Sequence, residues 1–169
     1  MFTRISAFLG TLIAKLLLKS CGQGVRFELP YKVSWKKIAI GNRVHIGCFA
    51  RLEASSENAH LEIHSETSIE QGSHIIFGDK MDIGKGTMIS SYVLITDTDH
   101  ILINDRTPKY NGLKILKTSI GQNCFLGAGC KILAGCILED NVIIGSNAVV
   151  LPGRYTAGTY VGNPAKKIK

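Results

Sequence analysis

A histidine, His100, ends an acid-rich segment of the sequence in which it could serve as a general base. Residues 95–100 read ITDTDH, so two carboxyl groups lie within three residues of the imidazole. Imidazole changes charge near neutral pH, which suits the removal of a proton from a hydroxyl group and its later return. Asp97 or Asp99 could fix the tautomer of the ring, bind hydroxyl groups of an acceptor, or cap a turn. On the residues alone, a surface histidine at a turn is the simpler interpretation.

The cysteines lack the spacing of a metal site. There are five of them, an odd number, and no two are separated by two residues. Cys124, Cys130 and Cys136 follow one another at intervals of six, which indicates a structural period rather than a set of zinc ligands. We therefore expect these thiols to be reduced and buried in a cytoplasmic protein.

The charge balance favours an anionic partner. The 169 residues include 20 Lys and Arg against 13 Asp and Glu, which gives a net charge of +7 and a pI of about 9.2. A nucleic acid, a membrane surface or a phosphorylated cofactor would each match this excess. Nucleic acid is the least favoured of the three, because the bases are scattered and few aromatic residues accompany them.

A six-residue hydrophobic period runs through the chain that must position these groups. The runs are Ile40, Ile46 and Leu52; Ile63, Ile69 and Ile75; Ile83, Ile89 and Ile95; and Ile120, Leu126, Ile132, Leu138, Ile144 and Val150. Neither the helical period of 3.6 nor the strand period of 2.0 explains this spacing. Six residues suit a short strand and a tight corner, with one aliphatic side chain and one small side chain pointing inward.

Three such units close a triangular coil, and coils stack at the strand spacing of about 4.8 Å. The period therefore predicts an all-β solenoid of about five coils, at 40–57, 63–80, 83–100, 120–137 and 138–155. The longest insertion, residues 101–119, is expected to form a projecting loop, and loops of this length are usually functional. By this register Asp99 takes an inward position at a corner.

The N-terminus predicts an amphipathic helix. Residues 1–20 contain three bases and no acid, and Lys15 interrupts the apolar run of about 20 residues that a transmembrane helix needs. No small-x-small cleavage site of a signal peptide follows Leu18. The apolar stripe consists of Phe2, Ile5, Leu9, Leu12, Ile13, Leu16 and Leu17. We expect this stripe to pack against the fold or a partner subunit; the alternative is a basic helix in the plane of an anionic membrane.

The repeat [LIV]-G-x-x-[small]-x, as at 120–125 and 126–131, resembles that of the hexapeptide-repeat acyltransferases. The resemblance covers about residues 40–169 and implies a left-handed parallel β-helix. Residues 95–100 before a long loop, together with the C-terminal G-N-P-A-K segment at 162–166, are similar to the galactoside, maltose and polysaccharide O-acetyltransferases. We divide the chain into an N-terminal helix (1–22), a β-helix acyltransferase domain (23–160) and a basic C-terminal segment (161–169).

The resemblance implies a mechanism and a set of site residues. His100 would be the general base in a direct transfer from acetyl-CoA to a sugar hydroxyl, with no acyl-enzyme. The enzyme would be a homotrimer with coenzyme A between two subunits, and the amide of Ala128 from the neighbouring subunit would stabilise the oxyanion. The implied cofactor-binding residues are Phe125, where the family usually has tryptophan, Gly127, Ser146, Lys166 and Lys169. Lys167 adds a charge beside the last two, and Arg154 could substitute for family contacts that the sequence lacks. The acceptor candidates are His74 and, in the loop, Asn104, Arg106 and Tyr110.

A metal interpretation is less favoured. His60 and His64 are four residues apart, but the close pair of zinc ligands that γ-carbonic anhydrases have late in the helix is missing, because no histidine follows His100. We predict no metal site.

The sequence also departs from the galactoside and maltose enzymes. Leu151-Pro152 replaces a usual Thr-Lys pair, and the acceptor asparagine is not found before His74. The chain looks more like the capsule, colanic-acid and O-antigen acetyltransferases. We expect a cytoplasmic O-acetyltransferase of surface polysaccharide or glycan biosynthesis, with the inner face of the membrane as a further possible location. The alternatives are an N-acetyltransferase acting on an amino sugar or nucleotide sugar, and a non-catalytic β-helix scaffold.

Overall fold

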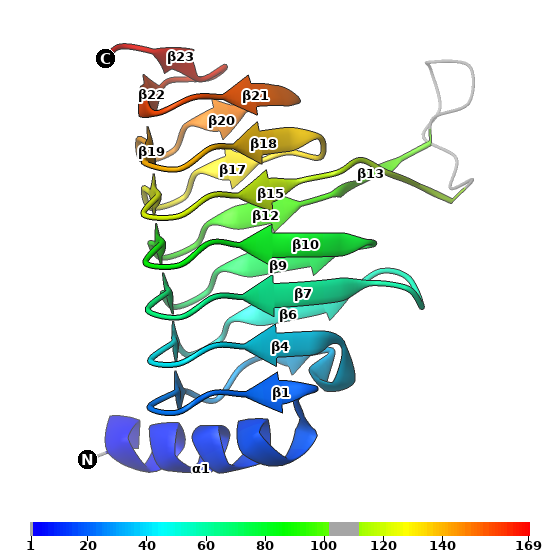
Figure 1. The fold of residues 1–169 in the computed structure, drawn as a ribbon, viewed down its shortest axis with the longest axis vertical. Helices are drawn as coiled ribbons and strands as arrows, with labels where there is room; N and C mark the ends of the chain where they lie inside the picture. Colours follow the sequence, from blue (N-terminus) through cyan, green and yellow to red (C-terminus); the bar gives the residue numbers. More distant parts are fainter. Residues whose placement is uncertain (1, 102–111) are drawn as a thin grey trace.

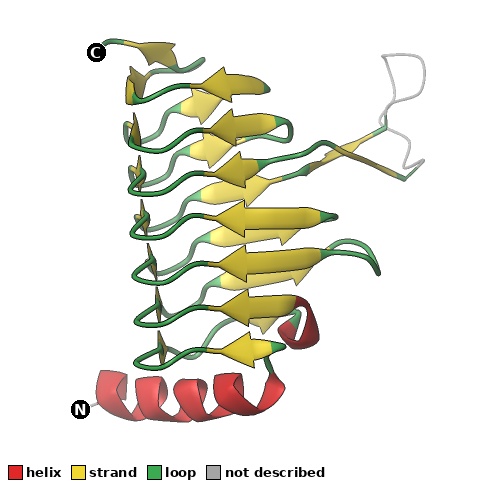
Figure 2. Cartoon of the chain, viewed as in Figure 1, coloured by secondary structure: helices red, strands yellow, loops and turns green. Residues whose placement is uncertain are grey.

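The chain folds as a three-sided parallel solenoid with one helix across its N-terminal end (Figures 1 and 2). The computed structural model describes residues 2–101 and 112–169, with side chains from Ala7 onward in the helix. The helix is α1 (Phe2–Leu17), and each full turn of the solenoid then adds one short strand to each of three sheets. A short 3₁₀ helix, η1 (Trp35–Lys37), follows the first turn.

The three sheets, here named A, B and C, form the sides of the solenoid. Sheet A contains β1 (Ser20–Cys21), β4 (Ile38–Ile40), β7 (His60–Ile63), β10 (Lys80–Ile83), β15 (Ser119–Ile120), β18 (Cys136–Leu138) and β21 (Gly153–Tyr155). Sheet B contains β2 (Arg26–Phe27), β5 (His45–Ile46), β8 (Ser68–Ile69), β11 (Met88–Ile89), β16 (Phe125–Leu126), β19 (Val142–Ile144), β22 (Gly158–Val161) and β23 (Lys166–Lys167). Sheet C contains β3 (Lys32–Val33), β6 (Arg51–Ala54), β9 (His74–Phe77), β12 (Leu94–Thr96), β17 (Lys131–Ile132) and β20 (Val149–Val150).

The six-residue period forms the core. In sheet A, Ile63, Ile83 and Ile120 are register partners in consecutive strands, and they are between 0 and 2% exposed. All the aliphatic residues of the predicted runs are buried in the same way. The small residues at the corners are buried too, and Cys124, Cys130 and Cys136 have exposures of 2%, 0% and 0%. The predicted all-β solenoid and the predicted burial of these thiols, which lie at three successive corners of one turn, are therefore confirmed.

The prediction of about five coils was too low, because the solenoid has about seven turns. One turn comes before the predicted coils, where Cys21, Phe27 and Val33 continue the inward columns in register with Ile40, Ile46 and Leu52. The other follows them, where Tyr155 and Tyr160 pair with Leu138 and Ile144. Cysteine and aromatic side chains fill all these inward positions except that of Val33, so the aliphatic period does not mark these turns.

The predicted projecting loop emerges as a hairpin between sheets C and A (Figure 1). Strand β13 (Thr98–His100) pairs antiparallel with β14 (Leu113–Ile115), and the solenoid resumes at β15. The coil ends at Thr96, so the next buried position is Asp97, which is 1% exposed, whereas Asp99 is exposed. The expectation that Asp99 points inward was wrong, because the chain leaves the coil two residues before that corner.

Helix α1 packs on the first turn through its small residues. Gly10 and Ala14 are buried, and a side chain on Gly10 would collide with the Phe27 carbonyl oxygen, 2.1 Å from the Cβ position. The Phe27 amide donates a hydrogen bond to the Thr11 hydroxyl at 2.9 Å. The apolar stripe does not face the fold of its own chain, since Leu16 is 75% exposed, and its packing against a partner subunit stays a prediction. No helix among the described residues combines the length and the apolar character that crossing a membrane requires.

Candidate functional site

His100 is the last residue of β13, on the hairpin that leaves the edge between sheets C and A. It pairs with Leu113 across the hairpin, and its side chain is exposed. The backbone amide of His100 donates to Oδ1 of Asp99 at 2.8 Å. The hairpin thus holds the imidazole away from the packed core, at a place that a substrate can reach.

Asp97 has a structural environment. Its carboxylate accepts hydrogen bonds from the Gly78 amide, at 2.7 and 2.9 Å, and from the Asp79 amide, at 3.1 Å. Burial raises the pKa of this carboxyl group, although the two amides act in the opposite direction. Asp97 therefore fastens the corner between β9 and β10 to the base of the hairpin. The roles predicted for Asp97 and Asp99 beside the imidazole stay predictions.

The predicted cofactor residues gather at a different edge, between sheets B and C. Phe125 lies on the outer face of β16 with 41% exposure, and Ala128 is exposed at the corner that follows. Gly127 lies against the next turn, where its Cβ position is 2.6 Å from the Ser146 nitrogen. The Asn147 amide donates to the Ala128 carbonyl at 2.9 Å. The structure therefore brings Phe125, Gly127, Ala128 and Ser146 together on two consecutive turns.

The basic C-terminal residues lie on the last turn. Strand β23 runs antiparallel to β22, with Lys167 opposite Tyr160 and Lys166 opposite Val161. The Lys167 ammonium donates to the Ala157 carbonyl at 2.8 Å and lies 5.8 Å from the centre of the Tyr160 ring. The Lys169 carbonyl accepts from the Thr159 amide at 3.1 Å. Lys166, Lys167 and Lys169 are exposed, so they give the C-terminal end of sheet B a cationic surface.

Arg154, the other predicted cofactor contact, lies apart from this group. It is on β21 in sheet A, and its guanidinium is 2.7 Å from Oε1 of Glu139. This ion pair is exposed, so it contributes little to stability and could be exchanged for another anion.

His74 lies on the outer face of sheet C, next to an ion cluster. Its Nε2 atom is 3.0 Å from Oε1 of Glu53, whose carboxylate also pairs with Arg51 and Lys32 at 2.6 Å each. Burial lowers the pKa of His74, and the Arg51 charge adds to this effect. Burial alone would raise the pKa of Glu53, but Lys32 and Arg51 outweigh it and lower that pKa. The Glu53 carboxylate acts in the opposite direction on the pKa of His74 but does not outweigh burial and the Arg51 charge. Asn104, Arg106 and Tyr110 lie outside the described residues.

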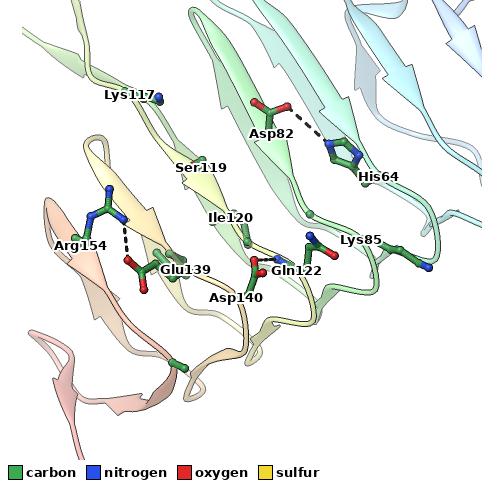
Figure 3. A pocket seen from close by; sticks show the side chains of 14 residues that line it. His64, Asp82, Lys85, Lys117, Ser119, Ile120, Gln122, Glu139, Asp140 and Arg154 are labelled. Atoms are coloured by element: carbon green, nitrogen blue, oxygen red, sulfur yellow. Dashed lines mark hydrogen bonds and ion pairs between the residues drawn. The ribbon is translucent and has the colours of Figure 1, made fainter.

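Sequence reasoning missed a polar hollow of about 950 Å³ on the outer face of sheet A (Figure 3). It runs over several turns and ends beside Lys117, in the segment that returns from the hairpin. Its described side chains include His64, Asp82, Lys117, Gln122, Glu139, Asp140 and Arg154. Such a mixture of donors and acceptors can bind a polyhydroxylated ligand. The sequence indicates which side chains of each strand point outward. Which of them lie side by side and so form this hollow follows only from the register between turns.

Three residues near this hollow have metal-ligating side chains. The ligand atoms of Glu62, His64 and Asp82 lie within 4.8 Å of one another, whereas His60 does not join them. Asp82 also lies 3.6 Å from the Lys80 ammonium, which competes for its charge. Exposed acidic groups are common without a metal, so the prediction of no metal site stays a prediction.

The two halves of the predicted site lie far apart along the perimeter of one chain. The hairpin with His100 is at the right of Figure 1, whereas β19 and β22 of sheet B are at the left. The whole outer face of sheet C separates the edge at Ala128 from the edge at His100. In a single chain, therefore, the candidate base and the candidate cofactor residues belong to different edges of the solenoid.

Comparison with known proteins identifies the repeat. Residues 117–152 match the family described as bacterial transferase hexapeptide (six repeats). The chain is 36% identical over 108 residues to the serine acetyltransferase of Helicobacter pylori strain 26695, a match over 64% of this chain. This chain spans 60% of the length of that relative. It is also 27% identical over 166 residues to WbbJ of Escherichia coli K12, which is named as an O-acetyl transferase of lipopolysaccharide biosynthesis. This match covers 94% of this chain and 83% of WbbJ.

Solved structures share the fold. AntD, an N-acyltransferase from Bacillus cereus solved with dTDP and 3-hydroxybutyryl-CoA, superposes with a TM-score of 0.78 at 21% identity, over 94% of this chain and 86% of AntD. A galactoside acetyltransferase in complex with coenzyme A superposes with a TM-score of 0.63 at 19% identity, over 94% of this chain and 68% of that one. The resemblance to hexapeptide-repeat transferases is confirmed.

Proposed function

We propose that this chain, whose coils carry the hexapeptide repeats of bacterial transferases, is an acetyl-CoA-dependent O-acetyltransferase that acts on a sugar hydroxyl. WbbJ is named as an O-acetyl transferase, and serine, the acceptor in the name serine acetyltransferase, bears a hydroxyl group. The similarity of this chain to both proteins supports this choice. The cationic surface of the last turn suits the phosphates of coenzyme A, because lysines act there as point charges. The acceptor would be a surface polysaccharide or one of its precursors.

In the proposed reaction His100 accepts the proton of the acceptor hydroxyl as the oxygen attacks the thioester carbonyl carbon. The carbonyl oxygen gains negative charge, and the amide of Ala128 donates a hydrogen bond to it. When the tetrahedral intermediate collapses, the C–S bond breaks and the imidazolium returns the proton to the leaving thiolate. The products are an O-acetyl ester and coenzyme A, and no acyl-enzyme forms.

The observation that carries this proposal is the separation of the two half-sites. His100 and Ala128 occupy different edges of one solenoid, so an intact site needs the edge of a second copy beside the hairpin of the first. A homotrimer with three-fold symmetry would place each hairpin against the cofactor edge of the next chain and so close three equivalent sites.

N-acylation of a nucleotide-linked amino sugar is the second candidate. AntD, which superposes over most of both chains, was also solved with dTDP-4-amino-4,6-dideoxyglucose and coenzyme A. An amine is a better nucleophile than a hydroxyl, so such an enzyme would depend less on a strong base.

The chemical stability of the product distinguishes these candidates. Purified full-length protein is incubated with acetyl-CoA and either de-O-acetylated surface polysaccharide or a dTDP-linked amino sugar, and the products are analysed by mass spectrometry before and after mild alkali. The proposal predicts an acetylated polysaccharide that loses its acetyl group in alkali, as an ester does. An alkali-stable product on the amino sugar would favour the second candidate. Failure to bind coenzyme A would favour the non-catalytic scaffold.

A further inference from the structure

The outer face of α1 is an unusually apolar surface for the end of a β-solenoid. The helix lies close against β2 through Gly10, Thr11 and Ala14. The large side chains of the helix therefore point away from the coil. The exposed fractions are 70% for Phe8, 45% for Leu9, 49% for Leu12, 37% for Ile13, 75% for Leu16 and 44% for Leu17. Soluble proteins rarely expose so contiguous a set, so this face is expected to have a partner.

The apolar surface continues beyond the helix. Next to Leu17 lies a hollow of about 320 Å³ whose other described residues are Ser34, Trp35, Lys36 and Lys37. Trp35 is half-buried and packs its ring 5.4 Å from that of Phe27. An indole at the border between apolar and charged groups is typical of protein surfaces that lie at a membrane interface.

The charge of the molecule is concentrated at the same end. Residues 1–37 contain seven of the 20 bases but one of the 13 acids, so they account for six of the seven net positive charges. The single acid, Glu28, is 8% exposed and lies 2.8 Å from the Arg26 guanidinium. Lys15, Lys19 and Lys36 are exposed around the apolar face. This end is therefore both apolar and strongly cationic.

The orientation of the helix allows a flat contact. Figure 1 shows α1 lying across the end of the solenoid, beneath the first turn, and not along the direction in which the turns stack. The helix has 16 residues, about 24 Å in length, and no helix among the described residues could cross a membrane. A plane can therefore touch the whole outer face of α1 while the rest of the solenoid stands away from it.

We propose that this face of α1 docks on an anionic phospholipid membrane, with the helix in the plane of the headgroups and its large side chains among the upper acyl chains. Apolar burial and attraction between lysines and anionic lipids act together in such helices. A second copy fits less well, because two such ends in contact would bring together six net positive charges from each chain within a Debye length. The proposal does not depend on the acetyltransferase reaction.

Flotation of the full-length protein with lipid vesicles tests this proposal. We expect the protein to float with vesicles of phosphatidylglycerol and phosphatidylcholine, to bind vesicles of phosphatidylcholine alone at least about tenfold more weakly, and to be partly released by high salt. Leu16→Glu should weaken binding at least about tenfold, because it places a charge in the apolar face. Ile168→Glu is the matched control: it changes an exposed aliphatic residue, 60% accessible, at the opposite end, and should float like the wild type.

Other outcomes would overturn the proposal. The membrane assignment is wrong if the wild type stays in the dense fraction at low salt, or if Leu16→Glu floats as well as Ile168→Glu. It is also wrong if sedimentation shows that Leu16→Glu splits a larger particle in the absence of lipid, since the face would then join copies of the chain. Thermal unfolding checks the variant; if Leu16→Glu does not fold, Lys15→Glu, which leaves the apolar face intact, must reduce flotation for the proposal to stand.

Discussion

His100 is held by backbone pairing rather than by packing, and this separates its chemistry from the stability of the fold. The imidazole is exposed on the hairpin, so its removal leaves no cavity in the core. We predict that His100→Ala lowers turnover by about 10²–10⁴, the usual contribution of a positioned general base, while coenzyme A affinity and melting temperature stay nearly unchanged. Release of free coenzyme A in the presence of the acceptor measures the turnover.

The same substitution at His60 provides the control. His60 is on β7, outside the proposed site, so His60→Ala should retain wild-type turnover. Unchanged turnover of His100→Ala on the true acceptor would contradict the assignment of the base.

His74 gives the fold a pH dependence of predictable sign. Its folded-state pKa is lowered by burial and by Arg51, so below pH about 6.5 the unfolded chain binds protons that the folded chain resists. Stability should therefore be complete above that pH and fall as the pH drops toward the folded-state pKa. We predict that the melting temperature falls less between pH 7.5 and 5.5 in His74→Gln than in the wild type. An equal fall in both proteins would show that His74 does not titrate as inferred.

The inward columns dominate stability at the scale of the elements. Burial raises the pKa of Cys130 and of Cys136 to about 12, which suppresses their thiolate forms. We predict that a maleimide reagent leaves Cys124, Cys130 and Cys136 of the native protein unmodified, and that unfolding exposes all three. Cys130→Phe should cost about 1–3 kcal/mol in urea unfolding, because the corner has no room for a ring. Rapid native labelling of Cys130 would contradict the register.

The six-residue period predicted most of the fold because the same repeat determines both the shape of each turn and the contacts between turns. A six-residue repeat places each aliphatic residue in a column whose neighbours are its counterparts in adjacent turns, so local pattern and tertiary contact coincide. The first turn was missed because Cys21 and Phe27 fill two of the three columns with other residue types, which leaves Val33 as a single aliphatic residue without a period. The exit of the chain at Asp97 could not be predicted either, since it depends on hydrogen bonds to the amides of Gly78 and Asp79, nearly twenty residues away.

The orientation of α1 shows that hydrophobic patterning alone does not predict which side of a helix packs on the fold. The stripe of large residues predicted a buried face, but close approach to β2 required Gly10 and Ala14 instead. A helix that caps a narrow solenoid has a backbone to contact rather than a cavity to fill, so small residues decide its orientation. The candidate site shows a similar limit. The residues at each edge could be named from the sequence, but the distance between the edges follows only from the three-sided cross-section.

At the scale of the whole molecule, the chain has two ends of different character, and the proposed site is divided between two of its edges. The cationic, apolar end at α1 suits a membrane, and the edges suit neighbouring copies. Together these features would orient a homotrimer with its axis along the membrane normal, so that its three sites would stand at equal height above the lipid. This arrangement would suit an enzyme that modifies a membrane-bound glycan precursor.

The central claim, that each site is shared by two copies, can be tested with hybrid trimers. His100→Ala removes the base from one edge, and Ser146→Trp blocks the exposed corner on the other without touching the core. The two variants are expressed together with different affinity tags, and particles that carry both tags are purified. In a ring with two copies of either variant, one pair of neighbours would form a complete site. In that pair the Ser146→Trp chain would supply the intact His100 edge, and the His100→Ala chain would supply the intact cofactor edge. We therefore predict about one third of wild-type turnover from hybrids of two variants that are nearly inactive alone. Hybrids no more active than the separate variants would contradict the shared site.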